Sequence, residues 1–146
     1  MRRGFEPVDN ERGKISVLPK RSTSWSAGYD LVTPEDITVP DEGLVSQGLG
    51  FKVAIPQNEA FLVANRSSSP KKGYVCPLGI GVIDADYYNN VSNEGEIFVI
   101  LMSVDGKEHF IPAGTRIAQG MFMEYHKTDD DDASGERVGG LGSTGI

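Results

Sequence analysis

Short apolar runs, each closed by residues that favour turns, recur along the chain, and no long stretch has the period of an amphipathic helix. Runs with the length of a strand lie at 15–18, 51–55, 60–64 and 96–102. Residues 51–55 alternate apolar and polar side chains, whereas 96–102 is almost wholly apolar and predicts a strand buried on both faces. Many short strands with regular turns indicate an all-β sandwich or barrel.

Two local signals refine this pattern. Asp105-Gly106 is a hairpin-turn signal, and it predicts a hairpin between 96–102 and the run at 109–111. One helical turn is expected at 68–71, because a serine could cap it and a proline could take its first position.

The end of the chain differs in composition from the rest. Residues 127–136 have almost no apolar groups and include four consecutive aspartates, so they cannot bury enough surface to order themselves. A glycine-rich segment, 137–146, follows. We therefore predict a β-barrel domain over 1–126, and an acidic linker with a glycine-rich arm over 127–146.

The composition limits the class of partner. With 146 residues and a net charge of -7, the chain suits one domain without the basic face that nucleic acids or anionic membranes need. No apolar run is long enough to span a membrane. We expect neither nucleic acid nor membrane as a partner. The single cysteine, Cys76, allows no internal disulfide and fits a cytoplasmic location.

Two polar segments could bind an anion despite this charge. In the first, an arginine and three hydroxyls open the predicted helical turn: Arg66, Ser67, Ser68 and Ser69. The alternative is an ordinary polar loop with a capping serine. In the second, glycines accompany one cation and two hydroxyls in the tail: Arg137, Ser143 and Thr144. The alternative is a frayed terminus.

A third segment joins glycines, carboxylates and an aromatic ring. Gly79 and Gly81 suit a hairpin whose bare backbone faces a flat base. Asp84 could orient a water, bind a metal or cap a turn, and Tyr87 could stack on a sugar or simply pack. Asp30 follows a glycine near the start of the chain and says little by itself.

Taken together, these segments resemble, in order and spacing, the five motifs of the trimeric dUTPase family. The motifs correspond to residues 27–31, 66–68 with 72–73, 81–87, 114–119, and 137 with 139–145. The resemblance runs from about Leu18 to the C-terminus. The third and fifth motifs are specific, whereas the first two are weak alone.

The resemblance implies a fold and an activity. Family members form a distorted jelly-roll β-barrel and a homotrimer whose active sites are shared. One subunit supplies the first, second and fourth motifs, a second supplies the base-binding hairpin, and a third lends its flexible C-terminal arm. The implied reaction is hydrolysis of dUTP to dUMP and pyrophosphate, which limits uracil incorporation into DNA and supplies dUMP for thymidylate synthesis.

The resemblance also implies roles on the catalytic side. Asp84 would position and activate the water that attacks the α-phosphorus, and Gln119 would help to hold that water. Phosphate oxygens would bind to Arg66, Ser67 and Ser68. Mg²⁺ would bridge the three phosphates, with Asp30 hydrogen-bonding the waters of the metal instead of ligating it. Arg116 would fix the phosphate-side network.

Substrate recognition would rest on the hairpin and the arm. Uracil would be read by the backbone around three residues, Gly79, Ile80 and Gly81, and Tyr87 would leave no room for a ribose 2′-hydroxyl. The arm would close over the nucleotide with Arg137, Leu141, Gly142, Ser143 and Thr144, of which Arg137 would hold the γ-phosphate.

The chain departs from the family's pattern in three places. Leu141 stands where many members carry a phenylalanine that stacks on the base, and the tail has one residue fewer than usual between Arg137 and the glycine pair. Residues 88–90 replace the usual continuation of the third motif, and 91–95 resemble a short insertion. We expect this insertion to alter a loop and not the chemistry.

Periodicity raises one conflict. In a straight strand, Arg116 and Gln119 point to opposite faces, because side chains alternate. If both serve one site, the strand must bulge or twist near Gly120, or one of the two residues acts indirectly.

Two other functions share parts of this pattern. A dCTP deaminase has the same fold, but it would release ammonia from dCTP and not pyrophosphate from dUTP. A non-catalytic regulator would bind dUTP to control a protein partner, and an Asp84→Asn variant discriminates the two, since we expect it to bind nucleotide with its turnover lost. The full tail and the third motif favour dUTPase.

Overall fold

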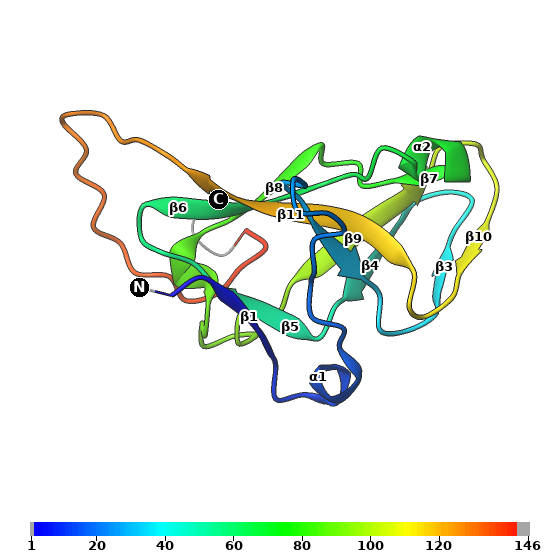
Figure 1. Cartoon of the computed structure of the whole chain (residues 1–146), viewed down its shortest axis with the longest axis horizontal. Helices are drawn as coiled ribbons and strands as arrows, with labels where there is room; N and C mark the ends of the chain where they lie inside the picture. The colour runs from blue at the N-terminus through cyan, green and yellow to red at the C-terminus, as the bar shows by residue number, and fades with distance from the viewer. Residues whose placement is uncertain (1, 143–146) are drawn as a thin grey trace.

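The computed structural model describes residues 2–142, and within them strands far outnumber helical turns. A four-stranded antiparallel sheet has the order β2-β11-β6-β8 (Figure 1). Its strands are β2 (Tyr29–Val32), β11 (Arg116–Glu124), β6 (Glu59–Ala64) and β8 (Ile80–Ile83). Most of the predicted site residues lie on this sheet or just beyond its ends.

Three smaller sheets complete the barrel. One has the order β4-β9-β7, with β4 (Leu44–Gly48), β9 (Phe98–Ser103) and β7 (Tyr74–Val75). The others pair β1 (Gly4–Pro7) with β5 (Phe51–Ala54), and β3 (Ile37–Val39) with β10 (His109–Ile111). The helical elements are α1 (Glu11–Ile15), α2 (Ser69–Lys72) and the 3-10 turn η1 (Ala85–Tyr87).

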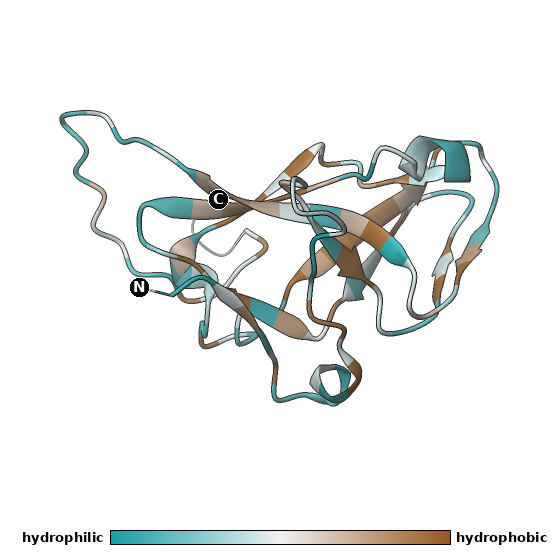
Figure 2. Cartoon of the chain, in the orientation of Figure 1, coloured by the Kyte–Doolittle hydropathy of each residue, from teal (hydrophilic) through white to brown (hydrophobic). Residues whose placement is uncertain are grey.

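An aromatic cluster fills one end of the core. Phe51 and Phe61 are fully buried, and Phe5 packs edge-on against both, with ring centroids 5.8 and 5.6 Å away. Phe122 of β11 adds a further edge contact with Phe61 at 5.0 Å. Figure 2 shows the apolar residues concentrated in the barrel, while the long segment after β11 is mostly hydrophilic. The chain is therefore an all-β barrel of jelly-roll type.

The predicted strand at 15–18 is wrong, because α1 ends at the first of these residues and no strand follows before β2. The Asn10 side chain caps α1 by accepting a hydrogen bond from the backbone of Gly13 at 3.1 Å. Arg12 forms an ion pair with the buried Glu96 at 2.6 Å. A cap and one ion pair thus stabilise a helix where the apolar pattern of the sequence predicted a strand.

The run at 96–102 does form a strand, β9, but the prediction of burial on both faces is wrong for the single chain. Val99 and Leu101 are buried, whereas Phe98 and Ile100 are half-buried and border a cavity. The second apolar face of β9 thus borders open space and does not pack on a second layer.

The predicted hairpin between this run and 109–111 is also wrong. β9 pairs with β4 and β7, whereas β10 pairs with β3, so Asp105-Gly106 connects two sheets. The Asp105 carboxylate accepts a hydrogen bond from the backbone of Lys107 at 3.1 Å and bonds to His109 at 2.8 Å. The turn itself is local, but the partner of each strand is decided by packing elsewhere.

The predicted helical turn is confirmed one residue further on, as α2. Its proline, Pro70, lies in the first turn, and Gly73 ends the helix in the left-handed region at φ 92°. Ser68 occupies the N-cap position, but its side chain makes no capping hydrogen bond. Nowhere in residues 2–142 does a helix have the length and apolar character needed to cross a bilayer.

Candidate active site

One group of predicted residues gathers around Asp30 on β2. Its carboxylate faces Arg66 Nε at 3.5 Å and Arg116 Nη1 at 3.4 Å, and it accepts a hydrogen bond from Ser22 Oγ at 2.5 Å. Gln119 lies directly opposite Asp30 in the register of β2 and β11. We call Asp30, Arg66, Arg116 and Gln119 the β11 cluster. It presents two guanidinium groups, and anions bind well to such pairs.

A β-bulge resolves the conflict over Arg116 and Gln119. Arg116 pairs with Val32 and Ala118 with Leu31, so Ile117 is an extra residue in β11. Ile117 and Ala118 are both buried. Because the bulge adds one residue, Arg116 and Gln119 point to the same face. The bulge lies before Ala118 and not near Gly120, where we expected it.

The backbone around the cluster also fixes Gln119. Its Nε2 donates a hydrogen bond to the backbone oxygen of Asn65 at 2.9 Å. A Cβ at position 28 would lie 2.3 Å from Gln119 Oε1, so any larger residue there would displace the Gln119 amide. Of the two predicted serines, Ser67 is exposed and Ser68 is half-buried, and both precede α2 next to Arg66.

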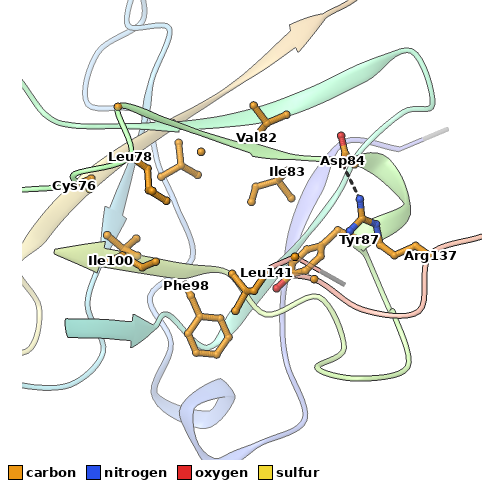
Figure 3. A pocket seen from close by; sticks show the side chains of 16 residues that line it. Cys76, Leu78, Val82, Ile83, Asp84, Tyr87, Phe98, Ile100, Arg137 and Leu141 are labelled. Atoms are coloured by element: carbon orange, nitrogen blue, oxygen red, sulfur yellow. Dashed lines mark hydrogen bonds and ion pairs between the residues drawn. The ribbon is translucent and has the colours of Figure 1, made fainter. Parts of the chain in front are cut away.

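A second group lines a cavity of about 330 Å³ beside β8, which we call the β8 cavity. Its walls come from β8 and the loop before it, from β9, and from the arm. They include Cys76, Leu78, Gly79, Gly81, Ile83, Asp84, Tyr87, Phe98, Ile100, Arg137, Gly140, Leu141 and Gly142. Figure 3 shows Leu78 and Leu141 approaching this cavity from different sides. Ile80, in contrast, has a 58% exposed side chain and is not part of the wall.

The loop before β8 is held by one side chain. Asn65 Nδ2 donates a hydrogen bond to the backbone oxygen of Cys76 at 3.1 Å, and Asn65 Oδ1 accepts one from the backbone nitrogen of Cys76 at 2.7 Å. Gly79 then turns the chain in the left-handed region at φ 73°. Burial raises the pKa of the Cys76 thiol to about 11, so this thiol is an apolar wall and not a nucleophile.

Asp84 and Asp86 share one cation. Arg137 Nη2 donates to Asp84 Oδ2 and Arg137 Nε donates to Asp86 Oδ1, both at 2.6 Å, as Figure 3 shows in part. Only 12% of the Arg137 side chain is exposed. Asp86 was not among our predicted site residues, although its spacing of two from Asp84 places both carboxylates in one short turn.

Tyr87 forms the buried wall of the β8 cavity, with 7% exposure. Its burial raises the pKa of the phenol. Gly140 of the arm lies against the ring so closely that a Cβ there would come within 2.2 Å of Tyr87 Cε1. Leu141 is 76% exposed and adopts a left-handed φ of 55°. Two predicted arm residues, Ser143 and Thr144, lie outside the described residues.

In the single chain the arm lies on its own barrel, and the lending of the arm by a third subunit, which the resemblance implied, stays a prediction. After β11 the segment swings outward and returns to the barrel (Figure 1). The register explains this path, since Phe122 of β11 faces Phe61 of β6, which faces Ile83 of β8. The arm therefore leaves the barrel roughly 10 Å, or two strand spacings, from the end of β8.

The β11 cluster and the β8 cavity are separate in one chain. Gln119 and Ile80 lie in one row across the sheet, both opposite Ala64, and Asp84 lies four residues beyond Ile80. Two strand spacings and four residues amount to roughly 16 Å between Gln119 and Asp84. A single water cannot contact both side chains at that separation.

Comparison with known proteins identifies the family. A family model described as dUTPase matches residues 15–145. The deoxyuridine 5′-triphosphate nucleotidohydrolase of Lactococcus lactis subsp. lactis (strain IL1403) is 40% identical over 146 residues, covering 98% of this chain and 97% of the relative. The enzyme of that name from Solanum lycopersicum is 35% identical over 136 residues, covering 90% and 76%.

A solved structure agrees with the sequence matches. The crystal structure of dUTPase from Streptococcus mutans superposes with a TM-score of 0.80 at 37% identity, covering 87% of this chain and 99% of that one. The chain thus combines a barrel like that of a solved dUTPase with paired arginines at Asp30 and a glycine-rich arm over Asp84. Its sequence matches one family along nearly its whole length, and this chain belongs to the dUTPase family.

Proposed function

We propose that this dUTPase cleaves its substrate where the β11 cluster of one copy of the chain meets the β8 cavity of another. The reaction is that of the family: dUTP and water give dUMP and pyrophosphate. The observation that carries the proposal is the register of the sheet, which places the backbones of Asp84 and Gln119 roughly 16 Å apart in one chain. Because both are expected at one attacking water, the site requires a second copy, and a homotrimer would provide three such sites.

Asp84 would orient the water that attacks the α-phosphorus and accept its proton. Its carboxylate is 55% exposed at the cavity, although it is now paired with Arg137. A guanidinium group exchanges a carboxylate for phosphate oxygens readily, because both offer two acceptors in a plane. An incoming triphosphate would therefore draw Arg137 to the γ-phosphate and free Asp84 for the water.

The β11 cluster would bind the phosphates. Arg66 and Arg116 already meet at Asp30, and Ser67 and Ser68 lie next to Arg66. Charge stabilisation by such groups contributes most of the rate in phosphoryl transfer. Gln119, fixed by its bond to Asn65, would hold the attacking water from the other side.

The donor set fits a magnesium ion held mainly by the nucleotide. Within the described part of the chain, no three histidine, cysteine, aspartate or glutamate residues gather in a group that could hold a metal. Asp30 is a single half-buried carboxylate, suited to accepting hydrogen bonds from metal-bound water. When bound, Mg²⁺ would neutralise charge on the phosphates and align them.

Base recognition would occur in the β8 cavity. Gly79 and Gly81 expose backbone groups that can pair with uracil, and the wall residues Leu78 and Ile83 would leave no room for the 5-methyl of thymine. Tyr87 would lie under the deoxyribose. Leu141 would cover the base with apolar contact and not with an aromatic stack.

The decisive activity test is a substrate panel. Pyrophosphate release should be fast from dUTP and slow from the four common deoxynucleoside triphosphates, and it should require Mg²⁺. Ammonia release from dCTP would indicate a deaminase instead. Size-exclusion chromatography with light scattering would test the homotrimer, and an active monomer would contradict the shared site. A cytoplasmic location stays a prediction from the single cysteine.

The source of the arm can be tested with mixed trimers. One variant carries Asp84→Asn, and the other ends after Asp132 and lacks the arm. If the arm serves its own Asp84, no site in the mixture has both groups, and activity stays at the sum of the separate variants. If another copy lends the arm, equal mixing should restore about a quarter of the wild-type sites.

A further inference from the structure

The hydroxyl of Tyr87 is held from two sides. It donates a hydrogen bond to the backbone oxygen of Glu96 at 2.7 Å and accepts one from Asn93 Nδ2 at 2.8 Å. Both partners belong to the segment between η1 and β9, not to the strands of the barrel. The ring is also covered by Gly140 and packs in the hydrophobic core, so the two hydrogen bonds of the hydroxyl add a directional hold to that packing.

Asn93 is itself fixed by its neighbours. Its Oδ1 accepts hydrogen bonds from the backbone of Gly95 at 3.0 Å and from Asn90 Nδ2 at 2.7 Å. Asn90 is 8% exposed, and its Nδ2 also donates to the backbone oxygen of Tyr87 at 2.7 Å. The two asparagines therefore link the main chain of Tyr87 to its hydroxyl through a closed set of hydrogen bonds.

The loop that carries these asparagines is anchored to the barrel. Glu94 accepts from Lys52 Nζ at 2.7 Å and from the backbone of Asp9 at 3.0 Å. Asn89 and Glu94 both have left-handed φ values, 58° and 66°, and their backbones are joined by a hydrogen bond of 2.9 Å. Non-glycine residues keep this conformation only where their surroundings specify it. The loop is thus a built support and not a loose insertion.

We propose that Asn93 is a positioning residue that holds the Tyr87 ring in the β8 cavity and thereby sets the preference for deoxyribose over ribose. The proposal rests on the proposed function, in which Tyr87 lies under the sugar. A ribose needs space for one extra hydroxyl, and a ring free to tilt would provide it. Asn93 does not touch the nucleotide; it acts through Tyr87.

The sharpest variant is Asn93→Asp. An aspartate keeps the shape and the acceptor that binds Gly95 and Asn90, but it replaces the donor to Tyr87 with a second acceptor. The matched control is Asn58→Asp, an exposed asparagine whose side chain bonds only to Glu124 at 3.3 Å among the described residues.

The measurement is kcat/KM for dUTP divided by kcat/KM for UTP. Loss of one neutral hydrogen bond should lower this ratio roughly fivefold in Asn93→Asp, mainly through faster UTP turnover, and leave it unchanged in Asn58→Asp. Tyr87→Phe should lower the ratio to a similar extent, and adding Asn93→Asp to it should have no further effect. Such non-additivity is not expected from general loop damage.

The outcomes separate the two proposals. Wild-type protein that does not prefer dUTP to UTP contradicts the assignment of Tyr87 to the sugar site. Wild-type preference with an unchanged ratio in Asn93→Asp, or independent effects in the double variant, overturns the role of Asn93. If Asn93→Asp does not fold, as judged by circular dichroism, Tyr87→Phe decides, and an unchanged ratio in that variant also overturns it.

Discussion

The β11 cluster and the β8 cavity are built on different kinds of backbone. Asp30 and Gln119 lie on strands with their side chains fixed by register, a bulge and a contact with Gly28. The cavity instead combines the edge strand β8, a 3-10 turn, a loop and the arm. Fixed strands suit the placing of charge around phosphates, which needs little movement. Irregular segments suit recognition and closure, because they can adjust when the nucleotide arrives.

The largest expected effect is the loss of turnover when the carboxylate of Asp84 in the β8 cavity is removed. Asp84→Asn keeps the size of the side chain but removes the base, so turnover of dUTP should fall by about 10²–10⁴-fold. The nucleotide should still bind, since the β11 cluster and the cavity walls remain. Pyrophosphate release and calorimetric titration with a non-hydrolysable dUTP analogue measure the two effects. Turnover at the wild-type rate would remove Asp84 from its assigned role.

The next effect tests the arm as a moving part. Arg137→Lys keeps the charge but loses the fork that now spans Asp84 and Asp86, so kcat/KM for dUTP should fall by roughly 10²-fold. Glu136→Gln, at an exposed neighbour on the arm, is the control and should stay near wild type. Equal losses in both variants would show that the fork of Arg137 has no special role.

A smaller effect tests the rigidity of the β11 cluster. In Gly28→Ala the new Cβ would lie 2.3 Å from Gln119 Oε1, so the amide must move. Misplacement of about 1 Å can cost up to 10²-fold in rate, and we expect kcat to fall roughly tenfold. Gly135→Ala, where a Cβ meets nothing within 4 Å, serves as the control. An unchanged kcat in Gly28→Ala would show that Gln119 tolerates displacement.

The smallest expected effect is on stability, and it concerns the turn between β9 and β10, which belongs neither to the β11 cluster nor to the β8 cavity. The hydrogen bond from His109, with further bonds from Lys107 and Ser103, lowers the pKa of Asp105 to about 2. A lowered folded-state pKa stabilises the fold above the unfolded value near 4, and this contribution is lost as the pH falls toward 2. Urea midpoints of wild type should therefore fall as the pH is lowered from about 4 to about 2.

Asp105→Asn should show a smaller fall in that window, because it lacks the titrating group. The exposed Asp41→Asn serves as the control and should follow wild type. The Asp105 carboxylate bonds to Ser103, Lys107 and His109, and none of these is a proposed site residue, so dUTP turnover at neutral pH should not change in either variant. A parallel loss of stability in all three proteins would contradict the assignment.

Several features could be predicted from the sequence because they depend on local chemistry. Alternation at 51–55 predicts β5, Pro70 predicts the start of α2, and the order of the motifs predicts the family. The prediction fails at 15–18, where a cap on Asn10 and the long-range pair of Arg12 with Glu96 override an apolar pattern. No local signal could reveal a partner that lies 84 residues away.

The sequence by itself determined that this is a small all-β dUTPase with an acidic linker and a glycine-rich tail, because composition, periodicity and motif spacing are properties of the chain alone. Only the tertiary structure decided which groups meet: the bulge that aligns Arg116 with Gln119, the capture of Asp84 by Arg137, and the support of Tyr87 by Asn93. Each of these is a spatial relation between two residues. Strand register and loop closure set the distance between the two residues, and no short window of sequence encodes either of them.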